Sequence, residues 1–315
     1  MCRTAVFFGD QLARYGFGAG HPWGTDRIYA FWSRLQAEQL DIVVEEPETA
    51  DEETILSFHE KQYVELVKMA SNSCRSIPLD RGDTPSFRRV FEATQYVVGS
   101  TLAALNAVVK GRDRAGRKVE HAFNPIAGLH HARRDTASGF CVFNDIGVAI
   151  IQARKYGIKK IAYVDIDAHH GDGVFYEFED DPQLFFADIH QSPLYPGTGF
   201  ESETGKGAAK GTKLNMPLPP GSGDDEFFRA FAKVQEFVDA AKPELIILQC
   251  GADSLAGDPI TDLQYSAKAH GHAAKILHEL AHRHCDGRII ALGGGGYNRD
   301  NIGNAWTEVV KAFAK

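Results

Sequence analysis

The sequence has few cysteines and no paired cysteine motif. Its five cysteines lie far apart with no Cys-x-x-Cys pair, which argues against a disulfide framework and favours free thiols in a reducing cytoplasm. No apolar run approaches the roughly 20 residues that a membrane helix needs. The apolar patch near the N-terminus is too short for a signal peptide. We therefore expect a cytoplasmic protein without a membrane segment.

Clusters of positive charge are missing as well. The net charge is -8, and no run rich in Lys and Arg forms the footprint of a nucleic-acid-binding protein. The 315 residues lie at the upper end for one hydrophobic core. Because the sequence contains no internal repeat, we expect a single domain over residues 1–315. The sequence leaves the oligomeric state open.

Short β-branched runs alternate with longer helical patterns along the chain. The runs are apolar throughout, as expected for strands that are covered on both faces. Strands are expected at 119–123, 161–167, 184–189, 245–250 and 288–292, and helices at 87–110, 144–156, 224–241 and 263–284. This alternation predicts an α/β fold with a central, mostly parallel sheet flanked by helices.

Polar residues gather where these strands end. Asp165, Asp167 and His169 alternate, and the strand period of two would put them on one face. Asp253 follows another apolar strand and is expected at the same edge of the sheet. Two carboxylates and one imidazole suit a catalytic zinc site, and they also suit ferrous iron or manganese. The alternative for the first three residues alone is that the Asp residues cap a turn.

Two adjacent histidines and one tyrosine add groups that can move or donate protons. His130 and His131 could act as general base or acid near neutral pH, with Asp165 and Asp172 as candidates to orient their rings. Tyr297 follows four glycines after a strand and could donate a hydrogen bond to an oxyanion. The glycine run lacks the G-x-G-x-x-G spacing of a nucleotide-binding loop.

Together these stretches resemble the histone deacetylase branch of the arginase–deacetylase superfamily, which includes acetoin-utilisation-type and acetylpolyamine deacetylases. The matching segments are GHP (20–22), GLHHARRDTASGFCVFND (128–145), YVDIDAHHGDGV (163–174), PGTG (196–199), CGADSLAGDP (250–259) and ALGGGGY (291–297). They follow the family's order over about the whole chain. The resemblance implies the arginase–deacetylase fold and a zinc-dependent amidohydrolase for acyl-lysine or similar acylated amines, with acetylpolyamine hydrolysis as the alternative.

The resemblance also implies roles for single residues. In the catalytic centre, Asp167, His169 and Asp253 would bind zinc, His131 would be the general base and acid, His130 its electrostatic partner, Asp165 and Asp172 their orienting carboxylates, and Tyr297 the group that polarises the carbonyl. The substrate would contact Phe140, Tyr195, Asp83, Gly139 and Ile260, with Phe140 and Tyr195 as tunnel walls and Asp83 at the rim. Arg27 would line a channel for acetate. A structural potassium ion would be bound by Asp165, Asp167, His169, Asp188 and Ile189.

Departures from related families narrow this interpretation. Gly171 and Gly251 stand where arginases carry ligands to a second metal, so one metal is expected. Ile260 stands where polyamine-selective relatives carry a Glu, which favours acyl-lysine over a cationic polyamine. A non-enzymatic acyl-lysine reader is a further alternative, but the full set of ligands, histidines and tyrosine argues against it.

One motif points to another class of enzyme. His278-Glu279-Leu-Ala-His282 matches the H-E-x-x-H helix signature of zinc proteases. Apolar residues at 273, 276, 277, 280 and 281 mark one face of the predicted helix. His278, Glu279 and His282, together with Lys275, are therefore predicted to face solvent.

Overall fold

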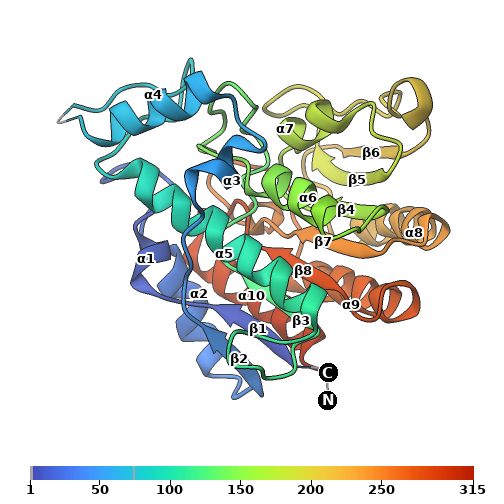
Figure 1. Cartoon of the computed structure of the whole chain (residues 1–315). Coiled ribbons are helices and arrows are strands. Elements are labelled where there is room, and N and C mark those ends of the chain that lie inside the picture. Colours follow the sequence, from blue (N-terminus) through green and yellow to red (C-terminus); the bar gives the residue numbers. More distant parts are fainter. Residues whose placement is uncertain (1–2, 74) are drawn as a thin grey trace.

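The structure is a computed structural model that describes residues 3–73 and 75–315. Eight strands form one parallel sheet in the order β2-β1-β3-β8-β7-β4-β5-β6 (Figure 1). The strands are β1 (Thr4–Phe7), β2 (Ile42–Glu45), β3 (His121–Asn124), β4 (Ile161–Asp165), β5 (Leu184–Gln191), β6 (Lys213–Leu218), β7 (Leu245–Gln249) and β8 (Ile289–Leu292). The predicted single α/β domain with a central parallel sheet is confirmed.

Helices cover both faces of this sheet (Figure 1). The α-helices are α1 (Asp10–Ala13), α2 (Arg27–Gln36), α3 (Glu52–Leu56), α4 (Lys61–Ser71), α5 (Val90–Lys110), α6 (Asp145–Lys155), α7 (Asp172–Phe175), α8 (Asp224–Ala241), α9 (Ala267–His284) and α10 (Arg299–Phe313), and the short 3-10 helices are η1 (Tyr176–Phe178), η2 (Gly207–Ala209) and η3 (Ala252–Ser254). Helices α4, α5 and α6 pack on one face, and α8, α9 and α10 pack on the other.

Strand β4 shows how the two cores are separated. Ile161 and Tyr163 belong to the core under α5 and α6, whereas Ala162 and Val164 belong to the core under α8, α9 and α10. Successive strand residues point to opposite faces, and both faces are buried here. This double burial explains why the strands are apolar throughout instead of alternating with polar residues.

The predicted elements are present, with shifted ends. The helix predicted from residue 87 begins at Val90, after Arg89 in a left-handed conformation (φ 64°). The helix predicted from 263 begins at Ala267, where the Ser266 side chain accepts a hydrogen bond from a backbone N–H. The strand predicted over 161–167 ends at Asp165. Three strands were not predicted, and two of these, β2 and β6, are the edges of the sheet.

The topology places the chemistry-bearing residues together. Strands β3, β8, β7 and β4 are consecutive neighbours, and the candidate residues follow the carboxyl ends of these four strands. The carboxyl ends of parallel strands all lie at the same end of the sheet, and α/β proteins have their binding sites beyond that end. Among the described helices, none is long and apolar enough to cross a membrane.

Candidate active site

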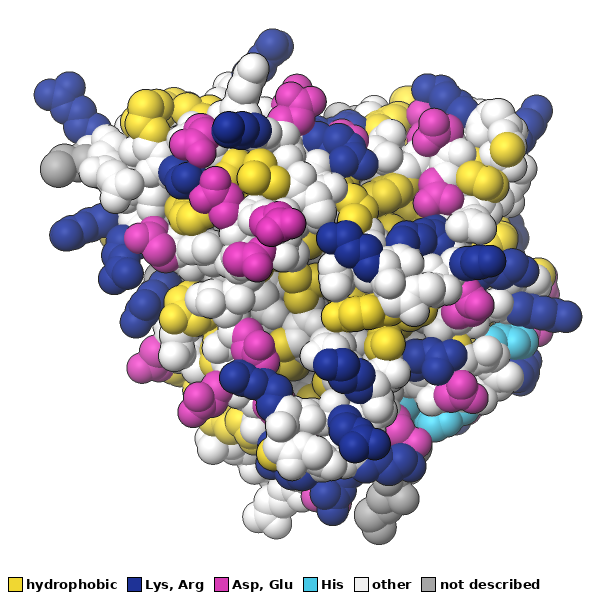
Figure 2. All heavy atoms as spheres, in the orientation of Figure 1, with side chains coloured by type: hydrophobic (Ala, Val, Ile, Leu, Met, Phe, Trp, Pro, Cys, Tyr) yellow, Lys and Arg dark blue, Asp and Glu magenta, His cyan; other side chains and the backbone are white. Residues whose placement is uncertain are grey.

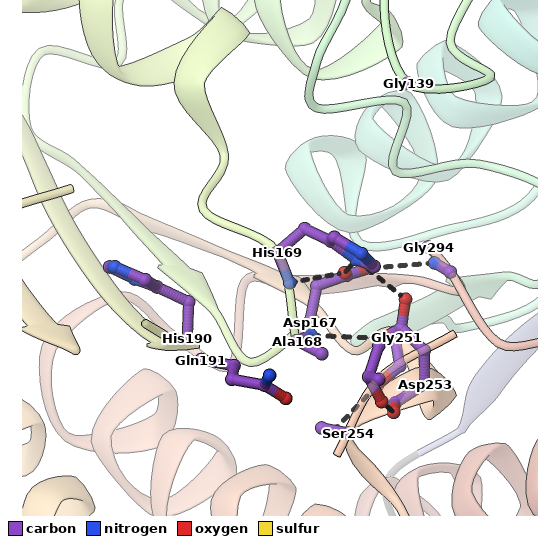
Figure 3. A network of polar contacts seen from close by, with 12 residues as sticks. Gly139, Asp167, Ala168, His169, His190, Gln191, Gly251, Asp253, Ser254 and Gly294 are labelled. Atoms are coloured by element: carbon purple, nitrogen blue, oxygen red, sulfur yellow. Dashed lines mark hydrogen bonds and ion pairs between the residues drawn. The ribbon is translucent and has the colours of Figure 1, made fainter. Parts of the chain in front are cut away.

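Three buried side chains converge beyond the ends of β4 and β7. Nδ1 of His169 lies 3.1 Å from a carboxylate oxygen of Asp167 and 3.1 Å from one of Asp253. One ligand atom from each of the three residues lies within 4.8 Å of the others. Figure 3 shows these side chains pointing toward one another beside Gly251. The three residues that the sequence suggests as metal ligands therefore meet in one place.

Neighbouring groups hold the two carboxylates in this position. Asp167 accepts hydrogen bonds from the side chain of Gln249 (2.8 Å) and the backbone N–H of Gly295 (2.8 Å), both on the same oxygen. Asp253 accepts one from the backbone N–H of Ala168 at 3.0 Å. A Cβ atom at Gly295 would collide with Asp253, so a glycine is required for the close approach of this loop.

The buried carboxylates of Asp167 and Asp253 favour a positive charge beside them. Burial lowers the pKa of His169, but its hydrogen bonds to Asp167 and Asp253 outweigh burial and raise this pKa to about 10. Burial and the charge of Asp167 raise the pKa of Asp253 to about 7. Two adjacent buried carboxylates thus draw a proton onto the imidazole, because carboxylates in a protein interior need a compensating positive charge. A divalent ion would supply that charge directly.

The two adjacent histidines each contact a separate carboxylate. Nδ1 of His130 lies 2.8 Å from Asp165, and Nδ1 of His131 lies 2.6 Å from Asp172. Because a carboxylate accepts hydrogen bonds, each Nδ1 carries a proton, and the carboxylate fixes the orientation of each ring. Arg133 contacts the other oxygen of Asp172 at 3.0 Å. These are the ring–carboxylate pairs that the family resemblance implies.

The same two histidines differ in charge. Burial lowers the pKa of His130, but the charges of Asp165 and Asp167 outweigh it and raise this pKa to about 9. Burial and the nearby charge of His130 lower the pKa of His131 to about 4, against the opposing effect of Asp172. Near neutral pH His131 is therefore a neutral proton acceptor, while His130 is positively charged.

Tyr297 lies on the loop after β8, and hydrogen bonds from Arg27 hold this loop in place. Buried Arg27 donates hydrogen bonds to the carbonyl oxygens of Gly294 (2.6 Å) and Gly296 (2.9 Å), and its guanidinium lies 3.9 Å from the centre of the Trp23 ring. Burial, followed by the charges of Asp253 and Asp167, raises the pKa of Tyr297 well above its usual value. The phenol therefore keeps its proton and can donate a hydrogen bond.

A cavity of about 240 Å³ leads to these groups from the surface. Its wall contains all five residues suggested for substrate contact, namely Asp83, Gly139, Phe140, Tyr195 and Ile260. At its base are His130, His131, Asp167, His169 and Tyr297. Most of the lining above this base is apolar or aromatic, as in sites that bind a mostly apolar group and fix it by a few polar contacts.

The wall of the cavity is shaped by an unusual backbone at Phe140. This residue has a positive φ of 65°, and the backbone is held there by Thr84, whose hydroxyl accepts from the Phe140 N–H (3.0 Å), and by Tyr15, whose hydroxyl donates to its carbonyl (2.6 Å). The preceding Gly139 also has a positive φ, and a Cβ there would collide with the ring of His131. The turn thus brings the cavity wall against the imidazole of His131.

The residues suggested for potassium binding lie behind this site. Asp165 of β4 and Asp188 of β5 are directly opposite in the strand register, and both are fully buried. The carboxylate of Asp188 accepts from the backbone N–H of Gly171 (2.9 Å) and lies 2.7 Å from Nδ1 of His190. Ile189 follows in the same strand.

Two sequence interpretations need correction. The alternation of Asp165, Asp167 and His169 was ascribed to a strand, but β4 ends at Asp165 and the next residues form a bend. They converge because the backbone turns, with the Asp167 and His169 N–H groups donating to Asp165 and Asp167. In the H-E-x-x-H helix, His278 was predicted to face solvent; it is half-buried against His121 and Phe313, because α9 packs beside β3 and α10.

Sequence reasoning missed three residues that support the site. Gln249 ends β7 and contacts Asp167; Tyr163 lies two residues before Asp165 and donates a hydrogen bond to it; and Asp258 accepts from the Tyr297 N–H at 2.8 Å. A signal existed for the first two residues. Gln249 is the polar residue at the end of an apolar strand, and Tyr163 shares the strand face of Asp165.

Comparison with known proteins gives consistent matches. The histone deacetylase domain family matches residues 21–313. The acetoin utilization protein AcuC of Bacillus subtilis is 35% identical over 99% of this chain and 81% of its own length. A probable deacetylase of Archaeoglobus fulgidus is 32% identical over 94% of this chain and 81% of its own. The crystal structure of the HDA15 HD domain has a TM-score of 0.89 and 25% identity, covering 100% of this chain and 90% of that one.

Proposed function

The chain belongs to the histone deacetylase family, and from this premise we propose that it is a metal-dependent deacetylase acting on acyl-lysine or a similar acylated amine. As a deacetylase of this family it is a hydrolase acting on amides. The observation that carries the proposal is geometric: Asp167, His169 and Asp253 converge on one point at the base of the cavity, and the carboxylate-held imidazoles of His130 and His131 line the same cavity.

The residues present fit one catalytic divalent ion, which we propose to be Zn²⁺. Asp167, His169 and Asp253 offer two carboxylate oxygens and one imidazole nitrogen, a donor set typical of catalytic zinc sites that keep a position open. When bound, the ion would polarise the acyl carbonyl and make a water molecule more acidic. No carboxylate stands at Gly171 or Gly251, so the chain offers no ligand there for a second ion.

His131 would act as the general base. Its ring is held through Nδ1 by Asp172, which leaves Nε2 to accept a proton from the attacking water. The lowered pKa keeps this nitrogen unprotonated at neutral pH. The proton would then pass to the leaving amine, so that one imidazole serves both halves of the reaction.

Tyr297 and His130 would stabilise the charge that develops on the substrate. The protonated phenol of Tyr297 lies at the base of the cavity and would donate a hydrogen bond to the carbonyl oxygen as it becomes an oxyanion. His130, positively charged and fixed by Asp165, would add a favourable field without taking up a proton. Arg27 would keep the tyrosine loop in place, and its buried, unpaired Nη1 would bind the acetate product.

The cavity wall favours a long, thin acyl-amine. Phe140 and Tyr195 would flank an apolar stem, as expected for the methylene chain of lysine. Ile260 at the wall offers no charge to a polyamine cation, whereas Asp83 offers a carboxylate to the substrate backbone. An acyl-lysine peptide is therefore favoured over an acetylpolyamine.

A structural potassium ion is a further part of the proposal. Asp165 and Asp188 form a pair of neighbouring buried carboxylates, and such a pair is stabilised by a cation. Asp167 and the backbone carbonyls of His169, Asp188 and Ile189 would complete a set of oxygen ligands with Asp165. The ion would stiffen the turn after β4 that carries the catalytic ligands.

A cytoplasmic location is also proposed. Cys141, Cys250 and Cys285 are free and buried, as expected in a reducing compartment.

A comparison of two substrates, measured separately, tests the proposed specificity. Acetate release would be measured from an acetyl-lysine peptide and from acetylputrescine, each with and without His131→Ala. The proposal predicts that kcat/KM is higher for the peptide and that both activities are lost in the variant. Higher kcat/KM for acetylputrescine would overturn the acyl-lysine assignment, and unchanged activity in the variant would overturn the mechanism.

A further inference from the structure

A second cluster of histidines lies at the opposite end of the sheet from the cavity. His121 is the first residue of β3, so it sits at the amino end of a strand whose carboxyl end leads toward the catalytic site. His278 and His282 are one turn apart on α9 and face it. Figure 2 shows histidine side chains reaching the surface in the region of α9. This cluster plays no part in the proposed deacetylation.

The ring nitrogens of two of these histidines are oriented by backbone carbonyls. Nδ1 of His121 lies 2.8 Å from the carbonyl oxygen of Gly287, and Nδ1 of His278 lies 2.9 Å from that of Ala312. A carbonyl only accepts, so both Nδ1 atoms carry protons and both Nε2 atoms carry lone pairs. A hydrogen bond from one ring nitrogen to a backbone carbonyl is the usual means of presenting the other nitrogen to a metal ion.

The spacing of the nitrogens fits a small tetrahedral ion. Nε2 of His121 lies 3.3 Å from Nε2 of His282, as a hydrogen bond that an ion bound between the two nitrogens would replace. Two imidazole nitrogens bound at 2.0–2.1 Å in a tetrahedral zinc site are about 3.3–3.4 Å apart. One nitrogen from each of the three rings lies within 4.8 Å of the others. A small rotation of the half-buried His278 and the exposed His282 would close the remaining gap.

The surroundings of the cluster leave room for an ion. Glu120 precedes His121 and adds a negative charge near His121 and His278, and it also pairs with Lys118 at 2.9 Å. Gly287, with a positive φ of 81°, lies against the rings, and a Cβ there would come within 3.0 Å of His282 and 3.2 Å of His121. The absence of a side chain at this turn thus keeps the space beside the imidazoles open.

From these observations we infer that His121, His278 and His282 form a second metal site, which binds a divalent transition-metal ion such as Zn²⁺ through three imidazole nitrogens. Imidazole ligands suit Zn²⁺, Cu²⁺ and Ni²⁺, whereas Mg²⁺ and Ca²⁺ require oxygen ligands. Three imidazoles leave the fourth position of a tetrahedral ion to a ligand from outside this cluster. The ion would join α9 to the start of β3, beside the end of α10.

The site differs from that of the zinc proteases that share its helix motif. Glu279, the residue that acts as general base in those enzymes, is exposed and pairs with Lys275 at 4.0 Å. The third ligand, His121, comes from a buried strand, and the cavity described above lies at the other end of the sheet. The inferred role is therefore to bind metal and clamp two elements together, not to hydrolyse peptides.

Zinc stoichiometry of the full-length protein tests this site. Equilibrium dialysis against Zn²⁺ would compare the wild type with His282→Ala and His278→Ala, and with Glu279→Gln and His272→Ala as matched controls on the same helix. The wild type should bind one ion more per chain than either cluster variant. Affinity at this site should fall by at least about 10- to 100-fold, the range seen when only an outer partner of a metal ligand is lost. Both controls should retain the additional ion.

Two further readouts separate loss of the site from loss of the fold. Zn²⁺ in excess should raise the melting temperature of the wild type more than that of His282→Ala, because an ion that binds only the folded state stabilises it. Deacetylation by the cluster variants should equal that of the wild type, since the catalytic groups lie at the other end of the sheet. Equal zinc content in the wild type and both cluster variants would overturn the inference, whether or not the catalytic site binds metal.

Discussion

Nδ1 of His131 lies 2.6 Å from the carboxylate of Asp172, and this contact fixes which ring nitrogen faces the cavity. The carboxylate also raises the pKa of His131 against the stronger lowering effects of burial and of His130. Orientation and basicity of the proposed base therefore depend on one residue that does not face the substrate.

Replacing Asp172 with Asn should lower kcat/KM for deacetylation by about 10²- to 10⁴-fold, the range that a general base contributes. The variant loses the charge that supports the protonated imidazole, and its amide can donate to Nδ1 as well as accept from it, so that it no longer selects one tautomer. Steady-state kinetics with an acetyl-lysine peptide would measure the effect, with zinc content as a control for the intact site. Wild-type kcat/KM in this variant would show that Asp172 is not needed to orient His131.

The pH profile follows from the direction of the His131 shift. The base is active when neutral, so activity should be lost only as the pH falls through its lowered pKa, about 4, and not near the ordinary value of 6.5. Activity should also fall on the alkaline side, as the pH rises through the pKa of His130, about 9, and its positive charge is lost. A bound cation would lower the pKa values of both histidines. An acid limb of kcat/KM at or above pH 6.5, in protein shown to be folded by circular dichroism, would contradict this assignment.

Tyr297→Phe should reduce kcat by about 10²- to 10³-fold while zinc content stays the same, because one oxyanion donor is lost. The ring remains, so its packing beside Phe140, with ring centres 5.9 Å apart, is preserved. Turnover and metal analysis on the same sample would separate the two effects. A fall in zinc content would show that the tyrosine supports the metal site and not the oxyanion.

Gln249→Ala should weaken zinc binding at the catalytic site by about 10- to 100-fold, because Asp167 loses a hydrogen-bonding partner that orients it. Competition with a chelator of known affinity would measure the change. Gln264→Ala, at an exposed position, serves as the matched control and should bind zinc like the wild type. Equal zinc affinities in the two variants would mean that the hydrogen bond from Gln249 to Asp167 does not strengthen zinc binding.

Ile260→Glu should shift preference toward acetylputrescine. A carboxylate at this partly exposed position of the cavity wall would attract the free ammonium group of the polyamine, an interaction worth up to about 1 kcal/mol, or roughly fivefold in the ratio of kcat/KM values. Ile260→Gln, of similar size without charge, is the control. An unchanged ratio in both variants would remove Ile260 from the determinants of specificity.

The sequence predicted what short, contiguous patterns encode. Apolar runs predicted the central strands. The polar residues that follow these strands predicted that Asp167, His169 and Asp253 lie close together, because parallel strands bring their carboxyl ends together. The edge strands β2 and β6 escaped prediction because they are only partly buried and carry mixed patterns.

Contacts between distant elements were beyond the sequence patterns. His278 was assigned to a solvated face from the helical period alone, but burial at that position is decided by His121 and Phe313, which come from other parts of the chain. The bend after Asp165 was not predicted because of local interactions. Alternating polar residues resemble a strand, but here the side chains of Asp165 and Asp167 accept hydrogen bonds from nearby backbone N–H groups and turn the chain.

Metal-dependent acetate release is the most direct test of the proposed deacetylase. The protein would be treated with a chelator, dialysed, and titrated with Zn²⁺ while acetate release from an acetyl-lysine peptide is followed in parallel with bound metal, for the wild type and for Asp253→Asn. We predict that chelation abolishes activity, that activity returns in proportion to occupancy of the catalytic site, and that the variant recovers none. Full activity in the metal-free wild type would contradict the account.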